Sequence, residues 1–101
     1  MDSPYICIWE YEVGAESRSE FERCYGRDGI WVELFRRAEG FVDTRLLTDR
    51  GNAGRYLTLD RWRSEAAYRN FRSKFAADYA RIDAICDALT QAERLVGEYA
   101  E

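Results

Sequence analysis

The segment from Arg55 to Leu89 constrains the fold of this chain more than any other. Residues 55–62 read Arg-Tyr-Leu-Thr-Leu-Asp-Arg-Trp, an apolar and aromatic run that is typical of a strand. Beyond Ser64, apolar residues recur at steps of three and four, the period of an α-helix, at Tyr68, Phe71, Phe75, Tyr79, Ile82, Cys86 and Leu89. A straight helix of this length would reach about 39 Å at ~1.5 Å per residue, longer than a small sheet needs. We therefore predict a bend or break near residues 76–78 or beyond Ile82.

Composition limits the class of protein. A chain of 101 residues, with 47% apolar and 15% aromatic residues, is expected to form one domain over residues 1–101 and to hide further apolar surface by self-association. No run approaches the ~18 apolar residues of a membrane span, so no membrane partner is expected. The net charge of -4 argues against nucleic acid. Cys7, Cys24 and Cys86 fit reduced core thiols, and with no secretory pattern at the start of the chain they predict a cytoplasmic location.

The other elements follow from the same kind of reading. Residues 5–13 alternate as a strand, and residues 93–99 form a last strand. Residues 41–48 form a second strand, whose alternation predicts one face with Phe41, Asp43, Arg45 and Leu47. Ser17 and Glu20 match a capping box at the start of a helix, for which Gly14 is an equally good cap. The glycine-flanked segment 26–29 separates this helix from a second short helix. The order βα(α)ββαβ predicts an α+β, ferredoxin-like fold: a four-stranded antiparallel sheet with its helices on one face. The free face is expected to meet a second copy, giving a homodimeric α/β barrel.

Several short pieces, taken in order, resemble the antibiotic biosynthesis monooxygenase family of dimeric α/β barrels. They are Ile8–Val13, Phe21–Tyr25, Gly29–Phe35, Gly40-Phe41, Leu46-Leu47, Arg55–Leu57, Asp60–Ser64 and Ala67-Tyr68. The resemblance implies a homodimer with a pocket between the sheet and the helices of each subunit. It also implies oxygenation of a small quinol-like or anthrone-like polyketide without a cofactor: the bound phenol loses a proton and its carbanion reduces O2. Such a site needs an apolar cavity and hydrogen bonds that hold the substrate oxygen as an anion.

One departure from the family narrows this expectation. Relatives that degrade haem hold iron through a helix histidine and place an asparagine in the first strand, whereas this chain has no histidine and reads Ile8-Trp9-Glu10 there. Haem degradation by that route is therefore disfavoured. The lack of histidine also removes the usual serine or cysteine triad and the commonest transition-metal ligand, so no metal and no cofactor are expected.

Three residues are the candidate catalytic set, and aromatic residues supply the candidate substrate contacts. Arg45 could stabilise a phenolate, Asp60 (or Glu10) could accept a proton, and Trp62 could stack on a ring or donate a hydrogen bond. We expect Arg45, Tyr56, Asp60 and Trp62 to converge on one cavity. The residues expected to bind substrate, a small aromatic or apolar molecule, are Trp9, Tyr11, Tyr56, Tyr68, Phe71 and Phe75.

Each of these residues also has a structural interpretation. Trp62 could be a core residue at the strand–helix corner, the aromatic stripe could be plain core, and the charged groups could pair with each other. The chain is accordingly interpreted either as a monooxygenase or as a non-catalytic dimeric module that binds a small ligand or has a structural role. An RNA-binding domain of the same topology is disfavoured, because residues 56–60 lack the glycine and aromatic pattern that stacks bases.

Overall fold

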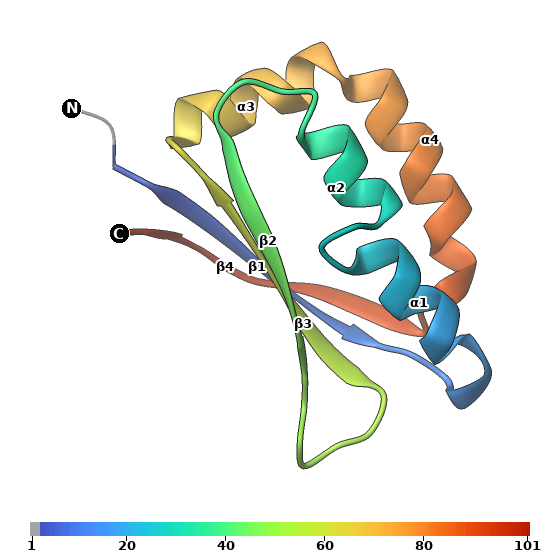
Figure 1. The fold of residues 1–101 in the computed structure, drawn as a ribbon. Helices are drawn as coiled ribbons and strands as arrows, with labels where there is room; N and C mark the ends of the chain where they lie inside the picture. The colour runs from blue at the N-terminus through green and yellow to red at the C-terminus, as the bar shows by residue number, and fades with distance from the viewer. Residues whose placement is uncertain (1–2) are drawn as a thin grey trace.

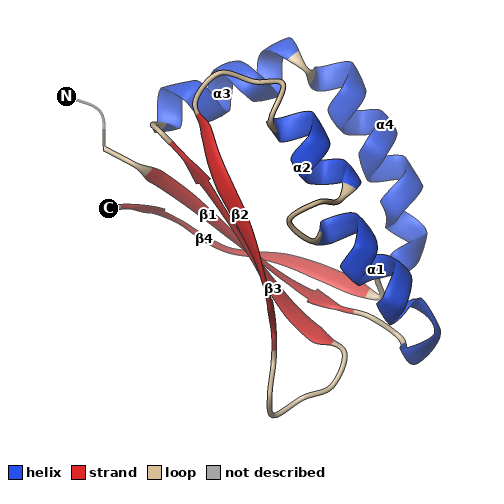
Figure 2. Cartoon of the chain, in the orientation of Figure 1, coloured by secondary structure: helices blue, strands red, loops and turns tan. Residues whose placement is uncertain are grey.

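A computed structural model describes residues 3–101. The fold is a four-stranded antiparallel sheet, in the order β2-β3-β1-β4, with all helices on one face (Figures 1 and 2). Its elements are β1 (Tyr5–Glu12), η1 (Ala15–Ser17), α1 (Arg18–Tyr25), α2 (Ile30–Phe35), β2 (Phe41–Thr48), β3 (Arg55–Trp62), α3 (Glu65–Lys74), α4 (Ala76–Cys86), η2 (Asp87–Leu89) and β4 (Ala92–Ala100). The predicted ferredoxin-like architecture is confirmed. Among residues 3–101 no helix combines the length and apolar character that a membrane crossing requires.

The two central strands decide which side chains face the helices. β1 pairs with β3 in a regular antiparallel register in which Tyr5 lies opposite Trp62, Cys7 opposite Asp60 and Tyr11 opposite Tyr56. Because side chains alternate along a strand, all of these residues share the helix-covered face. The side chains between them, such as Ile8 and Leu59, point to the open face of the sheet.

A β-bulge in β2 corrects the predicted alternation of that strand. The register shifts between Phe41 and Asp43, so Phe41 lies opposite Trp62 while Asp43 lies opposite Arg61. The extra residue, Val42, exchanges the two faces from that point on. Arg45 is therefore opposite Leu59, on the open face, and the predicted grouping of Phe41 and Arg45 on one face is wrong.

The long helical segment is broken, as predicted, though one residue earlier than the first of the two places expected. α3 ends at Lys74 and α4 begins at Ala76, with Phe75 between them at φ -108° and ψ 27°. The Ser64 side chain caps α3 by accepting a hydrogen bond from the backbone N–H of Ala67 at 3.1 Å. The capping box predicted at Ser17 is absent: η1 precedes α1, and the Ser17 side chain makes no cap hydrogen bond.

An aromatic cluster fills the space between the sheet and the helices. Trp62 has no solvent exposure, and its ring centroid lies 5.0 Å from that of Phe71, 5.3 Å from Phe41 and 5.6 Å from both Phe35 and Tyr68. These rings come from β2, β3, α2 and α3. The cluster therefore joins both layers of the fold at one point, and it accounts for the buried position of Trp62.

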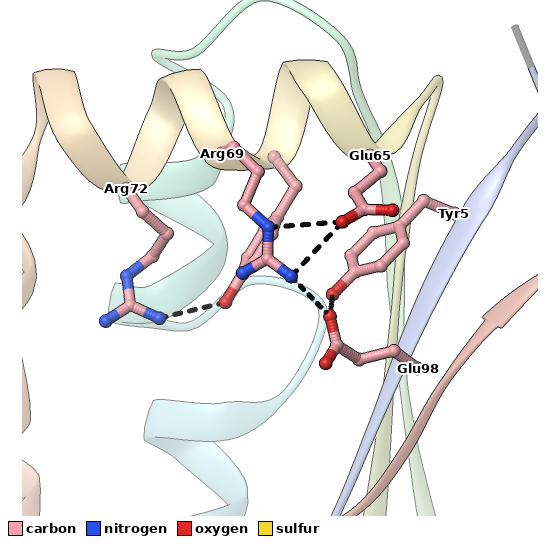
Figure 3. Close-up of polar contacts among 6 residues, drawn as sticks. Tyr5, Glu65, Arg69, Arg72 and Glu98 are labelled. Atoms are coloured by element: carbon pink, nitrogen blue, oxygen red, sulfur yellow. Dashed lines mark hydrogen bonds and ion pairs between the residues drawn. The ribbon is translucent and has the colours of Figure 1, made fainter.

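A network of charged and hydroxyl groups connects α3 to the edge strand β4 of the sheet (Figure 3). Arg69 donates hydrogen bonds to Glu98 of β4 at 2.8 Å and to Glu65 at 3.3 Å. Glu98 also accepts a hydrogen bond from the Tyr5 hydroxyl of β1. The side chains of Arg69, Glu98 and Tyr5 all find partners inside this network, and the network thereby connects α3 to β4 and β1.

Truncation of Trp62 is expected to destabilise the protein strongly. Trp62→Ala removes the ring that joins four elements, and large-to-small changes of this kind cost about 3–5 kcal/mol. Ile85→Ala is the matched control because Ile85, on α4, is 54% exposed, and we expect a change within about 0.5 kcal/mol. Urea unfolding followed by circular dichroism measures both. Equal losses in the two variants would contradict the central role of the cluster.

Candidate functional site

A cavity of about 50 Å³ lies between the helix-covered face of the sheet and the helices. Its lining combines aromatic rings with hydroxyl and carboxyl groups from β1, β2, β3, α1, α2, α4 and β4. The lining residues are Trp9, Tyr11, Tyr25, Trp31, Phe35, Thr44, Thr58, Asp60, Tyr79, Asp83 and Glu93. Helical spacing explains the contribution of α4, since Tyr79 and Asp83 are four residues apart and lie on one face of that helix.

Asp60 is the polar centre of the cavity. The Thr44 hydroxyl donates a hydrogen bond to Asp60 Oδ1 at 2.7 Å across the β2–β3 pair. Burial raises the pKa of the Asp60 carboxyl to about 6 and the charge of Asp43 adds to this, whereas the Thr44 hydrogen bond opposes it. Asp60 is therefore a carboxylate that exchanges its proton close to neutral pH, as a general base requires.

Two polar groups in the cavity wall have unmet hydrogen-bonding capacity. Thr58 Oγ1 and Trp31 Nε1 are buried, and neither has a hydrogen-bond partner within residues 3–101. An unpaired buried polar group costs about 1–3 kcal/mol, so a ligand oxygen at this wall would recover free energy. The neighbouring phenols stay protonated at neutral pH, because burial raises the pKa of Tyr11, Tyr25 and Tyr79.

The exposed end of the cavity is acidic. Glu93 of β4 lies opposite Tyr11 in the sheet, and both Glu93 and Asp83 are exposed to solvent. Burial raises the pKa of Glu93, and the like charges of Asp83 and Asp87 raise it further. No Lys or Arg is among the described residues that line the cavity. Within residues 3–101, no group of three or more His, Cys, Asp or Glu side chains is placed to hold a metal ion.

The size of the cavity limits what it can hold without movement. A cavity of roughly 150 Å³ is needed to enclose a single benzene ring, which is three times the volume present here. Among the aromatic residues of the lining, Trp9 and Tyr79 are the two that are only partly buried. An aromatic ligand can enter only if lining side chains move, and we expect Trp9 and Tyr79 to be the rings that do so.

The structure brings three of the predicted site residues together at this cavity: Trp9, Tyr11 and Asp60. Trp62, predicted to be catalytic, lies in the core and does not line the cavity. Arg45, predicted to stabilise an anion, is exposed on the open face because of the β2 bulge. The predicted convergence of Arg45, Tyr56, Asp60 and Trp62 is therefore wrong.

The remaining predicted contacts lie elsewhere in the aromatic core. The Tyr56 hydroxyl donates to Glu22 of α1 at 2.6 Å, and Tyr68 stacks on Tyr5 at 5.1 Å between centroids. Phe71 is 1% exposed, and Phe75 packs on it at 5.7 Å. These four residues are absent from the cavity lining. Their positions agree with the alternative interpretation, in which the aromatic stripe is plain core.

The sequence indicates no site role for seven of the lining residues. Tyr79 belongs to the aromatic stripe of the long helical segment, which is interpreted either as a wall of the pocket or as plain core, and it does line the cavity. The spacing of Tyr25, Trp31 and Phe35 predicts only the buried faces of two short helices. Thr44 and Thr58 carry a usable signal, because a polar residue on the buried face of a strand needs a reason. Asp83 and Glu93 carry no such signal, since an exposed carboxylate is common on any surface.

The comparisons with known proteins identify the family. The family model for antibiotic biosynthesis monooxygenase matches residues 4–81. The chain belongs to this family. No curated protein sequence matches it significantly.

Solved structures of several proteins share the fold. SnoaB from Streptomyces nogalater, a cofactor-independent oxygenase, has a TM-score of 0.72 at 20% identity over 98% of this chain and 93% of its own. PA3566 from Pseudomonas aeruginosa has a TM-score of 0.71 at 18% identity over 100% and 96%. A conserved protein from Methanosarcina mazei Go1 has a TM-score of 0.72 at 14% identity over 96% and 91%. At these identities the likeness establishes the fold alone.

The titration of Asp60 is a direct test of the site. We expect an apparent pKa near 6, and a higher value in Thr44→Val, because that variant removes the hydrogen bond that favours the charged form. Carboxyl carbon chemical shifts recorded against pH measure both. An Asp60 that titrates near 4 in the wild type would contradict the geometry.

Stability should follow from the same shift. The pKa of Asp60 is higher in the folded than in the unfolded state, so its stabilising contribution is complete below the unfolded value and is lost as the pH rises through about 6. As the pH is raised from 4 to 7, the free energy of unfolding of Asp60→Asn should therefore increase relative to that of the wild type by about 1–3 kcal/mol. Urea unfolding of both proteins at each pH provides the difference.

Proposed function

We propose that this protein is a cofactor-independent monooxygenase that acts with O2 on a small phenolic or quinol-like substrate. The observation that carries the proposal is Asp60: a carboxylate with a pKa of about 6, placed in an aromatic cavity beside two unpaired polar groups. Membership of the monooxygenase family supports it, and so does the shared fold of SnoaB, which is a cofactor-independent oxygenase.

The chemistry that this site would perform balances without a cofactor. Asp60 takes the phenolic proton, and the resulting carbanion form of the substrate transfers electrons to O2. A carbon–oxygen bond forms, giving a hydroperoxide on the ring carbon. The proton that completes the hydroperoxide is the phenolic proton, which Asp60 returns to the peroxide. Loss of water from the hydroperoxide then removes the one hydrogen of that ring carbon and leaves one oxygen atom in the product as a carbonyl. The substrate therefore loses two hydrogens, one from its hydroxyl group and one from the carbon, and the second oxygen atom leaves in the water. The substrate is oxidised and O2 is reduced.

Proton transfer to Asp60 leaves the net charge of the cavity unchanged, because the carboxylate becomes neutral as the substrate becomes an anion. The indole N–H of Trp31 and the hydroxyl of Thr58 are the groups that would donate hydrogen bonds to the substrate oxygen. The sequence predicts that Arg45 and Asp60 act together. In this proposal Asp60 acts without Arg45, since Arg45 lies on the other face of the sheet.

A non-catalytic ligand-binding protein of the same fold is the alternative, and the small cavity favours it. A site that must reorganise before a ring can enter fits a binding module as well as an enzyme. The two functions differ in one measurable property, consumption of O2.

We also propose that two copies associate through the open face of the sheet. This face presents Ile8 beside Leu59 at its centre, and nearer its margins Leu47 and Tyr99 are 41% and 47% exposed. It also carries charged groups, Arg45 and the Asp43–Arg61 ion pair. The apolar patch on this mixed face is expected to be covered in solution. The dimer implied by the family resemblance supports the same arrangement.

Oxygen uptake tests the catalytic proposal. We expect the purified, metal-stripped protein to consume O2 with at least one member of a panel of anthrones, hydroquinones and catechols. Asp60→Asn should lower kcat/KM by about 10²–10⁴-fold, the usual contribution of a general base. In the wild type kcat/KM should rise with pH through about 6, because only the ionised carboxylate accepts a proton.

The matched control is Glu33→Gln, which removes one carboxylate from the exposed side of α2, outside the cavity lining. Its activity should equal that of the wild type. Uptake that Asp60→Asn leaves unchanged would overturn the role of Asp60. No uptake across the panel by a folded protein would favour the binding module.

The dimer is tested by placing a charge at the centre of the open face. Leu59→Lys should convert a dimer to a monomer, because each interface would then bury an unpaired ammonium group. Ile85→Lys, on the exposed side of α4, makes the same chemical change away from that face and should leave the dimer intact. Sedimentation velocity measures the mass of each species, and a wild-type monomer would contradict the proposal.

A further inference from the structure

The charges of the residues that line the cavity are all of one sign. Its lining contains three carboxylates, Asp60, Asp83 and Glu93, and among the described residues that line it there is no Lys or Arg to balance them. Arg72 of α3 lies close to one wall: its guanidinium is 4.0 Å from the centroid of the lining residue Tyr79, and it donates to the Tyr68 hydroxyl at 2.9 Å. The three lining carboxylates outnumber this one arginine, so an anionic ligand would be repelled.

Several other carboxylates of the molecule have a basic partner, in contrast to this set. Asp43 pairs with Arg61 at 2.7 Å, Glu98 with Arg69 at 2.8 Å and Glu10 with Arg94 at 3.2 Å. Within residues 3–101 none of the three cavity carboxylates forms a salt bridge. Asp83 and Glu93 also lie beyond residue 81, where the family match ends.

The other walls of the cavity suit a cation as well. Aromatic faces attract an ammonium group through their negative electrostatic surface. Trp9 and Tyr11 line the same space as the carboxylates, whereas the ring of Tyr79 already has the Arg72 guanidinium 4.0 Å from its centroid. Thr58, which is 3% exposed, also lines it and has a hydroxyl without a partner, so a buried polar group independent of the acidic residues indicates that a ligand is bound here.

We propose that the ligand of this cavity is a small phenol that carries a protonated amine, with its hydroxyl group at Asp60 and Thr58 and its ammonium group at Asp83 and Glu93. This inference rests on the proposed function, because it assigns the phenolic hydroxyl to Asp60. The ammonium group neutralises the carboxylates at the exposed end, and the single ring lies against the aromatic wall. The small volume of the cavity favours a ligand with a single ring.

Three para-substituted phenols of nearly equal size separate charge from shape: tyramine is cationic, 4-ethylphenol is neutral and 4-hydroxyphenylacetate is anionic at pH 7.5. Binding to the wild-type protein is measured by isothermal titration calorimetry, and the indole ¹H–¹⁵N signals of Trp9 and Trp31 report where the ligand lies. We expect tyramine to bind about tenfold or more tightly than 4-ethylphenol, and 4-hydroxyphenylacetate to bind most weakly. Raising the salt concentration should reduce the preference for tyramine and leave 4-ethylphenol unchanged.

The double variant Asp83→Asn with Glu93→Gln should weaken tyramine to the level of 4-ethylphenol without changing 4-ethylphenol binding. Glu33→Gln, which removes a charge outside the cavity, should leave all three affinities as they are. Equal binding of tyramine and 4-ethylphenol by the wild type, or no binding of any of the three, would overturn the proposal.

The same ligands separate this inference from the proposed function. Tyramine-selective binding without O2 uptake would support the ligand class and count against the oxygenase. O2 uptake with neutral phenols and no preference for tyramine would support the oxygenase and overturn the ligand class.

Discussion

The burial of β3 is the constraint on which the rest of the structure depends. This strand is hydrogen-bonded to β1 on one side and β2 on the other, and helices cover its inward face. Tyr56 and Trp62, at its two ends, are held in the aromatic core. Thr58 and Asp60, between them, are polar groups that the sheet cannot turn away from the helices. The fold thus forces a carboxylate into an aromatic environment, and the raised pKa of Asp60 follows from that position.

The cavity exists where the aromatic packing stops short of these polar side chains. Around Trp62 the rings of β2, β3, α2 and α3 pack against one another, whereas over Asp60 the side chains of α2 and α4 leave a small hollow. The Arg69 network holds α3, which contributes to the aromatic cluster and lies outside the cavity lining (Figure 3). The hollow is therefore bordered by α2 and α4 and not by α3.

Electrostatics gives this site its individual character within a widely used fold. The family and its fold accommodate different ligands, so the nature of the ligand depends on the groups that line the cavity. Here those groups are carboxylates and aromatic rings, with the basic residues paired on other surfaces. That distribution is the physical reason to connect the site with proton removal and with a ligand that is not an anion.

The sequence by itself determined the order of the elements and placed Asp60 on the same face of β3 as Tyr56 and Trp62, because side-chain periodicity is a local property of the chain. It left open which face of β1 meets the helices. It could not show that one extra residue in β2, Val42, moves Arg45 to the open face, since a bulge depends on pairing with another strand. It also could not separate aromatic residues that fill space, such as Trp62 and Phe71, from those that border it, such as Trp9 and Trp31. Only tertiary packing decides where side chains fall short of one another. The same reason applies to Asp83 and Glu93, which lie far in sequence from Asp60. They line the cavity because α4 and β4 both border it in the folded protein.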